Sequence, residues 1–171
     1  MKSIKFFSSI FYYAVKIIAF GYLFTAFYIL VNCIFEGPFF EKLETNRFAI
    51  NFPFTSKHFL LGSEFSITYV TEMVLGIALY GLFFLLLSGV FNAFKQEKLF
   101  TDFGIKKLTH FYIFNLVAYP ILAIIWSCIS IEDFPFIAMI IAHLIMGFFI
   151  LFMNAIFKQG LQLQNEQDLF I

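Results

Sequence analysis

The sequence predicts an all-α integral membrane protein, a four-transmembrane-helix up-down bundle with a small β-hairpin in its first extracytoplasmic loop. Four apolar stretches each reach the roughly 20 residues that a helix needs to cross a hydrocarbon core of about 30 Å. Hydrophobic residues make up 61% of the 171 positions and charged residues only 13%, whereas about a quarter of a soluble domain is charged. Positive charges gather on one side of the four stretches. Together these observations place the chain in a bilayer.

The predicted spans are separated by connections of unequal length. The spans cover about residues 11–34, 73–94, 108–129 and 136–157, with an outer loop at 35–71, a cytoplasmic loop at 95–107 and a cytoplasmic tail at 158–171. Short loops after the second and third helices make consecutive helices antiparallel neighbours. The first span is too long for a signal-peptide core and no Ala-x-Ala pattern follows it, so we expect it to be retained. We expect one membrane domain over residues 1–171.

The distribution of positive charge predicts the orientation, because Lys and Arg in short loops resist translocation. One side of the predicted bundle holds seven lysines: Lys2, Lys5, Lys95, Lys98, Lys106, Lys107 and Lys158. The other side holds Lys42, Arg47 and Lys57 in its long loop, and Glu132 and Asp133 in its short turn. Both termini are therefore expected in the cytoplasm.

The outer loop is too long to be a simple connection. Phe48, Ile50, Phe52 and Phe54 alternate with other residues, and Phe65, Ile67 and Tyr69 repeat this pattern after Gly62. Alternation of this kind is typical of half-buried strands and predicts a hairpin that covers one end of the bundle. Its role stays open between a lid over the helix ends and a surface for a ligand or partner.

Four local signals refine the helices. Thr101 before Asp102 predicts that the third helix begins there, before the membrane does, because their side-chain oxygens can accept from unpaired amides of the first turn. Pro120 after Tyr119 predicts a bend in that helix. The polar tail from Lys158 is expected to continue the fourth helix. Small residues at four-residue spacing are expected to allow close helix approach, at Gly89 with Ala93 and Ala138 with Ala142.

Polar side chains inside the predicted spans are candidate functional groups, because burying them in hydrocarbon is costly. They are Lys16, Asn92, Asn115, His143 and Asn154. Lys16 lies about 9 Å from the cytoplasmic end of its span, within snorkelling distance of the headgroups. The three asparagines lie in the cytoplasmic half, where they either hydrogen-bond between helices or form a polar site.

Several function classes find no support in the sequence. With 11 basic and 11 acidic side chains the net charge is zero, so no broad basic field is present to bind nucleic acid directly. His110 and His143 are expected to lie roughly 17 Å apart along the membrane normal and cannot share a metal. No Cys-x-x-Cys, His-Glu-x-x-His, Gly-x-Ser-x-Gly or phosphate-binding glycine motif occurs. The sequence therefore predicts a protein that is not an enzyme and has no metal or cofactor.

The two cysteines are candidates for a disulfide. Cys33 and Cys128 both fall at the predicted outer ends of helices that run in the same direction. A bridge would require Cα atoms within about 7 Å and an oxidising compartment. Two buried thiols are the alternative.

The cytoplasmic segments resemble a known family. Residues 156–171 read Ile-Phe-Lys-Gln-Gly-Leu-Gln-Leu-Gln-Asn-Glu-Gln-Asp-Leu-Phe-Ile, and residues 100–108 read Phe-Thr-Asp-Phe-Gly-Ile-Lys-Lys-Leu. With four spans and a long first outer loop, this pattern resembles the bacterial membrane-protein family catalogued as domain of unknown function 2975. The family tail usually has a second basic residue where this chain has Gln159, and more acidic or Asn character where it has Asn165 and Gln167.

The resemblance implies regulation, because members of that family are encoded beside small helix-turn-helix regulators and have no established catalytic residues. We therefore expect a cytoplasmic platform that holds a small transcription regulator. Its expected contact residues are Lys106, Lys107, Glu166, Asp168, Leu169, Phe170 and Ile171. The alternatives are an accessory subunit of a larger membrane complex and a small dimeric carrier or channel. Pairing of Glu166 or Asp168 with the loop lysines is the competing explanation for the tail.

Overall fold

A computed structural model describes residues 2–130 and 134–168 of the chain. Its helices are α1 (Lys2–Phe35), α2 (Ile67–Lys95), α3 (Asp102–Ile113), α4 (Tyr119–Ser127) and α5 (Phe136–Asp168). A π-helical turn, η2 (Phe114–Ala118), joins α3 to α4 into one continuous helix. Four helices in the described part of the chain, this joined one included, are long and apolar enough to cross a membrane.

All four predicted spans are helical, and each observed helix is longer than the apolar stretch that predicted it. The spans that meet the length and hydropathy of a membrane helix are Ser3–Phe35, Ile67–Lys95, Asp102–Ser127 and Phe136–Gln167. Hydropathy marks only the apolar part of a helix, so the polar turns at both ends are not counted. The expected continuation of the last helix beyond Lys158 is confirmed, because α5 ends at Asp168.

The segment between α1 and α2 forms a three-stranded antiparallel sheet, not a hairpin. Its strands β1 (Phe40–Lys42), β2 (Phe48–Asn51) and β3 (His58–Gly62) pair in the order β1-β2-β3. The strand predicted from Phe48 to Phe54 is confirmed only as far as Asn51, because a turn follows in which Phe54 has a φ of 61°. The predicted strand at residues 65–69 is wrong, because Ile67 begins α2. Three alternating apolar residues fit the first turn of a helix as well as a strand.

A π-helical turn precedes Pro120, where a bend was predicted. Pro120 has no amide hydrogen to donate to the carbonyl of residue 116. Immediately before it, the Tyr119 amide donates to the Phe114 carbonyl, five residues back. A π turn of this kind inserts one extra residue into a helix and shifts which side chains face the neighbouring helix. The shifted residues include Asn115, which is fully buried.

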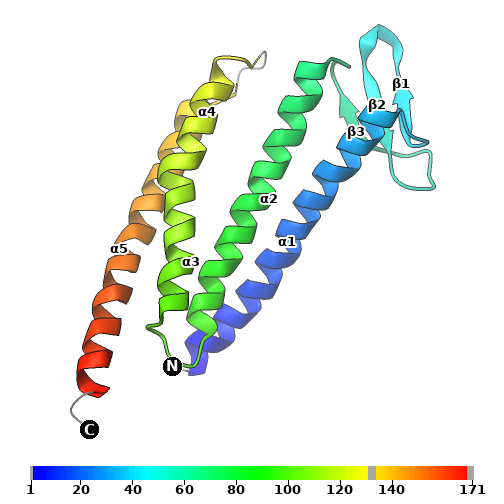
Figure 1. Cartoon of the computed structure of the whole chain (residues 1–171). Coiled ribbons are helices and arrows are strands. Elements are labelled where there is room, and N and C mark those ends of the chain that lie inside the picture. Colours follow the sequence, from blue (N-terminus) through cyan, green and yellow to red (C-terminus); the bar gives the residue numbers. More distant parts are fainter. Residues whose placement is uncertain (1, 131–133, 169–171) are drawn as a thin grey trace. The chain divides into compact units, whose positions relative to one another are not determined.

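The chain divides into two compact units, which we describe separately. Unit 1 comprises Met1–Ala19 and Leu82–Ile171, and unit 2 comprises Phe20–Gly81. In unit 1, α3, η2 and α4 pack along α5 (Figure 1). A buried apolar cluster of this unit draws on three helices and comprises Val90, Leu108, Phe111, Ile150 and Phe157. The prediction of a single membrane domain stays a prediction.

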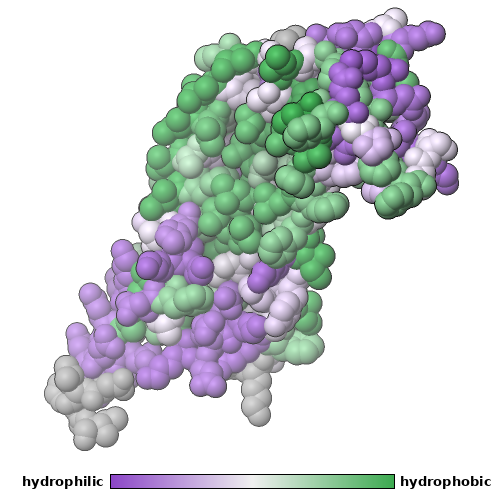
Figure 2. Space-filling model, turned by 45° about the vertical axis from the view of Figure 1, so that its right-hand side comes forward, coloured by the Kyte–Doolittle hydropathy of each residue, from purple (hydrophilic) through white to green (hydrophobic). Residues whose placement is uncertain are grey.

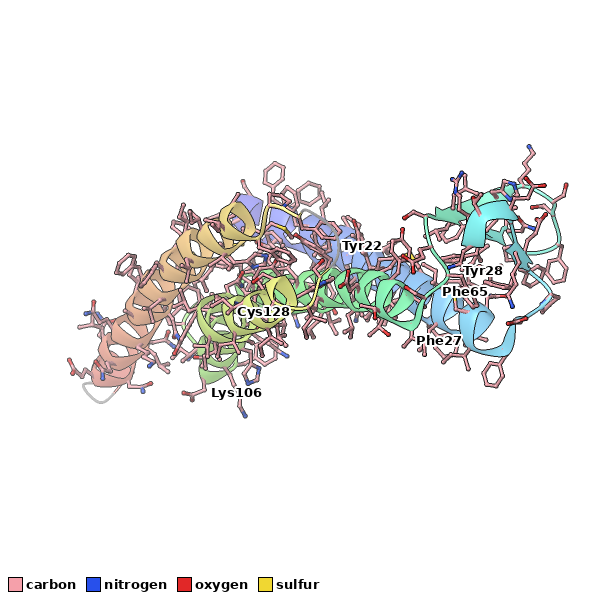
Figure 3. The ribbon with its side chains drawn as sticks, turned by 90° about the horizontal axis from the view of Figure 1, so that it is seen from above. Tyr22, Phe27, Tyr28, Phe65, Lys106 and Cys128 are labelled. Carbon is pink, nitrogen blue, oxygen red and sulfur yellow. The ribbon has the colours of Figure 1, made fainter. Side chains whose placement is uncertain are left out.

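Unit 2 has its own core, where the sheet packs against the two helix segments that flank it in sequence. Buried residues of α1 and α2 meet β2 there: Ala26, Ile29, Cys33, Val74, Phe48 and Ile50. Aromatic rings fill the remaining space. Figure 3 shows Tyr28 on α1 and Phe65 before α2 beside this core, and the Tyr28 hydroxyl donates to the Asn51 carbonyl over 2.7 Å.

The helices expose large apolar side chains over much of their length. Ile17, Phe24, Ile137 and Ile145 each have more than 60% of their surface exposed. On the face drawn in Figure 2, hydrophobic residues cover the helices, while hydrophilic residues gather over the sheet and around the lysine-bearing ends of the unit 1 helices. A helix that is apolar on all sides suits a lipid environment and not water.

Candidate functional site

A buried polar cluster lies between η2 and α5 in unit 1. Asn115 is 0% exposed and His143 is 8% exposed. The Asn115 Oδ1 and His143 Nδ1 atoms are 2.7 Å apart, which is hydrogen-bonding distance. Two of the predicted intramembrane polar residues are therefore partners, although the sequence did not pair them.

The second hydrogen bond of Asn115 fixes the proton on the imidazole. Asn115 Nδ2 donates to the Phe111 carbonyl over 2.8 Å, so its Oδ1 must be the atom that faces the histidine. A carboxamide oxygen only accepts, and His143 Nδ1 must therefore carry the hydrogen. In a neutral imidazole this leaves Nε2 as the acceptor of the ring. The arrangement is a buried base of defined tautomer.

Aromatic side chains surround the imidazole. The Tyr119 ring stacks on it with a centroid separation of 3.4 Å and an interplanar angle of 14°. Phe83 and Phe114 approach it edge-on, with centroids at 5.3 Å and 6.4 Å. These contacts hold the ring plane in place and keep Nδ1 aligned with Asn115.

A glycine on α5 allows η2 to come this close. Gly147 lies one turn beyond His143 on the same face of the helix. A Cβ atom at Gly147 would lie 2.6 Å from Leu116 Cδ2 and 3.2 Å from Asn115 Cβ, which is too close for carbon atoms. The predicted small-residue pair Ala138 and Ala142 does not serve this purpose, because both residues are exposed.

A second polar contact joins α3 and α5 nearer the lysine-bearing end. Asn154 Nδ2 donates to Thr109 Oγ1 over 2.8 Å. The Asn154 Oδ1 atom is buried and has no hydrogen-bond partner among the described residues. Asn92 bonds at the end of α2, where its carbonyl and side-chain oxygens accept from Gln96, the residue after the helix. The three asparagines therefore make three separate contacts instead of one polar site.

Lys16 is not isolated at the edge of its apolar helix. Its ammonium donates to the Tyr12 hydroxyl over 3.0 Å, one turn towards the N-terminus, which is the direction expected for snorkelling.

The two cysteines belong to different units. Cys33 is buried in unit 2, Cys128 is exposed at the end of α4 in unit 1 (Figure 3), and both are free thiols. The predicted disulfide stays a prediction.

Three of the predicted partner-binding residues, Lys106, Lys107 and Glu166, lie at the end of unit 1 where α2 ends, α3 begins and α5 extends. Lys106 is exposed and points away from α3 (Figure 3), and Lys107 is half-buried. Glu166 is exposed, and within the described residues it forms no ion pair with either lysine. The Asp168 side chain and residues 169–171, which include Leu169, Phe170 and Ile171, lie outside what the structure describes, as do Glu132 and Asp133.

Phe157 and Gly160 fix the base of the tail to the rest of unit 1. Phe157 is 3% exposed and packs edge-on against Phe94 and Phe100. A Cβ atom at Gly160 would lie 2.7 Å from the Phe100 ring. Beyond this anchor most of α5 is exposed, and Leu163 has 61% of its surface accessible.

Within residues 2–130 and 134–168, no three His, Cys, Asp or Glu side chains are grouped so that they could hold a metal ion. The chain was compared with models of protein families, with curated proteins and with solved structures, and none matched. The four long apolar helices are compatible with a multi-pass membrane protein. The family resemblance of the tail stays a prediction.

Proposed function

We propose that this chain is a non-enzymatic, multi-pass protein of the bacterial inner membrane that holds a small cytoplasmic regulatory protein on the helical tail of α5. The observation that carries the proposal is this tail, an exposed and largely polar helical extension on an anchored base. The proposal has three parts, which are insertion, orientation and partner binding.

Insertion is supported by the exposed apolar side chains of the four helices. In water, such a surface would far exceed the apolar patches of soluble monomers, which rarely pass a few hundred Å². We expect the chain to stay in the pellet when membranes are washed with alkaline carbonate and ultracentrifuged. Recovery in the supernatant without detergent would remove this part of the proposal and the two that rest on it.

Orientation is supported by contacts that bring the lysine-bearing segments to one end of unit 1. Lys95 at the end of α2 donates to the Tyr13 hydroxyl on α1, and Phe157, next to Lys158, packs against Phe94. The four lysines between residues 95 and 107 therefore share an end of the unit with Lys158 on the tail. The positive-inside rule assigns such an end to the cytoplasm. A C-terminal tag should resist protease added to intact cells and be cleaved after the inner membrane is permeabilised.

Partner binding is supported by the surface of the tail. Leu163 and Glu166 are three residues apart and share one face of the helix, and both are exposed. An exposed leucine beside an unpaired carboxylate suits a partner that offers an apolar pocket rimmed by basic side chains. A small DNA-binding regulator carries such basic surface.

The test compares two variants of the full-length chain at native expression level. Leu163→Ser combined with Glu166→Gln alters the proposed face, whereas Asn165→Ser, two positions along and on the opposite side, is the matched control. After gentle solubilisation, mass spectrometry should find a small cytoplasmic protein with the wild type and the control, and at least about tenfold less of it with the double variant, as expected for the loss of an interface anchor. Equal recovery from all three chains, or no such protein from any, would exclude the platform.

A further inference from the structure

Three lysines from three helices gather around one tyrosine in unit 1. The first part of α1 meets the last part of α2, where Phe11 and Phe91 stack with ring centroids 5.3 Å apart. This contact brings Tyr12 and Lys16 of α1 next to Lys95 of α2. The Lys16 ammonium donates to the Tyr12 hydroxyl, and the Lys95 ammonium lies 4.8 Å from the centroid of the same ring.

Lys95 is held in a fixed position by two aromatic rings. Besides its contact with Tyr12, its ammonium lies 4.6 Å from the centroid of the Tyr13 ring and donates to the Tyr13 hydroxyl over 3.2 Å. Ammonium groups over aromatic faces are attracted by the ring quadrupole. A lysine side chain held in this way has already lost much of its conformational entropy, so binding a ligand costs less.

Lys107 approaches this group from α3, where its ammonium lies 5.4 Å from the centroid of the Phe103 ring. Its side chain crosses α2 at Gly89, where Lys107 Cδ lies 3.2 Å from the position that a Cβ atom would take. Its charge acts on the Tyr12 hydroxyl together with the charges of Lys16 and Lys95. The absence of a side chain at Gly89 thus leaves room for the Lys107 side chain on this side of α2.

No carboxylate of the described residues neutralises this group. Among the residues that the structure describes, the ion pair found joins Lys42 and Glu36, which are in unit 2. Lys16, Lys95 and Lys107 are each half-buried, so they are partly withdrawn from water while their charges repel one another. A bound anion would relieve both costs. The Tyr12 hydroxyl accepts from Lys16 and still has its own hydrogen to donate.

We propose that Lys16, Lys95, Lys107 and the Tyr12 hydroxyl form a binding site for a phosphate-bearing anion at the membrane surface. The inference rests on the proposed membrane insertion. Three ammonium groups and one hydroxyl match the acceptor oxygens of a phosphate group, and basic pockets between transmembrane helices take anionic lipid headgroups. Ile17 beside the site is 72% exposed and offers an apolar surface to the acyl chains of such a lipid. Phosphatidylglycerol is therefore the first probe.

The experiment uses the full chain in neutral detergent, with lipid binding followed by native mass spectrometry. Phosphatidylglycerol is titrated against phosphatidylcholine as the neutral lipid, and inorganic phosphate is titrated in a separate arm by thermal unfolding. Lys95→Gln with Lys107→Gln removes two charges from the site. The control variant, Lys106→Gln with Lys158→Gln, removes two exposed charges from the same end of the unit. Its net charge therefore changes by the same amount as that of the site variant.

We expect the site variant to bind phosphatidylglycerol about 25-fold more weakly, since each lysine near an anionic surface contributes about fivefold. The control should bind within about twofold of the wild type. Tyr12→Phe keeps the ring beneath Lys95 and removes only the hydroxyl, so it should weaken binding without altering the helical circular dichroism. The site variant could instead lose only its thermal stabilisation by inorganic phosphate and bind phosphatidylglycerol as the wild type does. That result would support the site and identify a soluble phosphate as its ligand.

Equal weakening in the site and control variants would overturn the proposal, because it would indicate non-specific attraction to charge. So would a wild type that does not prefer phosphatidylglycerol to phosphatidylcholine and gains no stability from inorganic phosphate. Carbonate washing of the same variants separates these outcomes from a failure of membrane insertion. A chain that stays in the membrane but lacks selective binding would refute the site and leave insertion intact.

Discussion

His143 on α5 and Asn115 in η2 form a hydrogen bond in which Nδ1 and Oδ1 are 2.7 Å apart. Asn115 lies in the π-helical turn, and Gly147, one helical turn after His143, leaves room for that turn beside α5. The polar pair, the turn and the glycine therefore act as one structural feature of unit 1.

Breaking this pair should destabilise the protein by an amount typical of hydrogen bonds between membrane helices. For Asn115→Ala, His143→Ala and the double variant, we expect a coupling free energy of about 0.6 kcal/mol, and at most about 1.7 kcal/mol. Unfolding in detergent micelles by increasing dodecyl sulfate measures it through a double-mutant cycle. His110→Ala, on an exposed residue of α3, is the control and should change stability little. Strict additivity of the two substitutions would mean that the contact contributes nothing.

Gly147→Ala should cost more than its small volume suggests. The added methyl group would lie 2.6 Å from Leu116 Cδ2, and forcing extra volume into a packed contact costs about 1–3 kcal/mol. Gly21→Ala is the matched control, because nothing lies within 4 Å of the position that its methyl group would take and Ala favours a helix by up to about 1 kcal/mol. The same micelle assay should show the two substitutions moving stability in opposite directions. If Gly147→Ala is neutral or stabilising, η2 and α5 are not in close contact.

The spans and the third helix's start could be predicted because their signals are local. Apolar length marks a span, and Thr101 does cap α3, where its hydroxyl accepts from the Gly104 amide over 3.1 Å. The pairing of Asn115 with His143 gave no such signal. Asn115 is 14 residues from position 129 and His143 seven from position 136, so level helix ends would place them about 10 Å apart in depth.

Sequence periodicity predicted the strands of the sheet less well than the helices. Alternation located β2 but extended it past Asn51 to Phe54. The strands β1 and β3 carry little alternation, so their pairing depends on contacts between strands that sequence periodicity does not report. The Tyr12 lysine cluster was missed for a similar reason, because its members come from three helices and only Lys16 is inside an apolar stretch.

Gly62→Ala should disrupt the sheet, because the Phe48 ring lies across this position. Gly62 pairs with Phe48 in the register of β2 and β3, and a Cβ atom there would overlap the ring. We expect faster cleavage by protease within residues 36–66 in micelles, with the helical circular dichroism unchanged. Adding Phe48→Leu frees space and should restore part of the resistance. Protection that equals the wild type would mean that Phe48 does not cover Gly62.

Thr101→Ala should loosen the first turn of α3 by about 1 kcal/mol, the usual cost of losing an N-cap side chain. Hydrogen exchange of the Gly104 amide should accelerate, since that amide loses its partner. Thr101→Ser keeps the hydroxyl and should exchange like the wild type. Unchanged exchange in both variants would show that the amide is protected by packing against Phe157 instead.

The two cysteines should differ in reactivity, which also tests the predicted bridge. Cys128 is exposed and Cys33 is buried, and a thiol reacts as its thiolate, which water stabilises. In micelles without reductant, a polymer-linked maleimide should therefore add once to the folded chain and twice after denaturation. Cys128→Ser should abolish the first addition, whereas Cys33→Ser should leave it in place. If neither thiol reacts until a reductant is added, even in denaturant, then Cys33 and Cys128 are joined, and the ends of α1 and α4 must lie within disulfide reach.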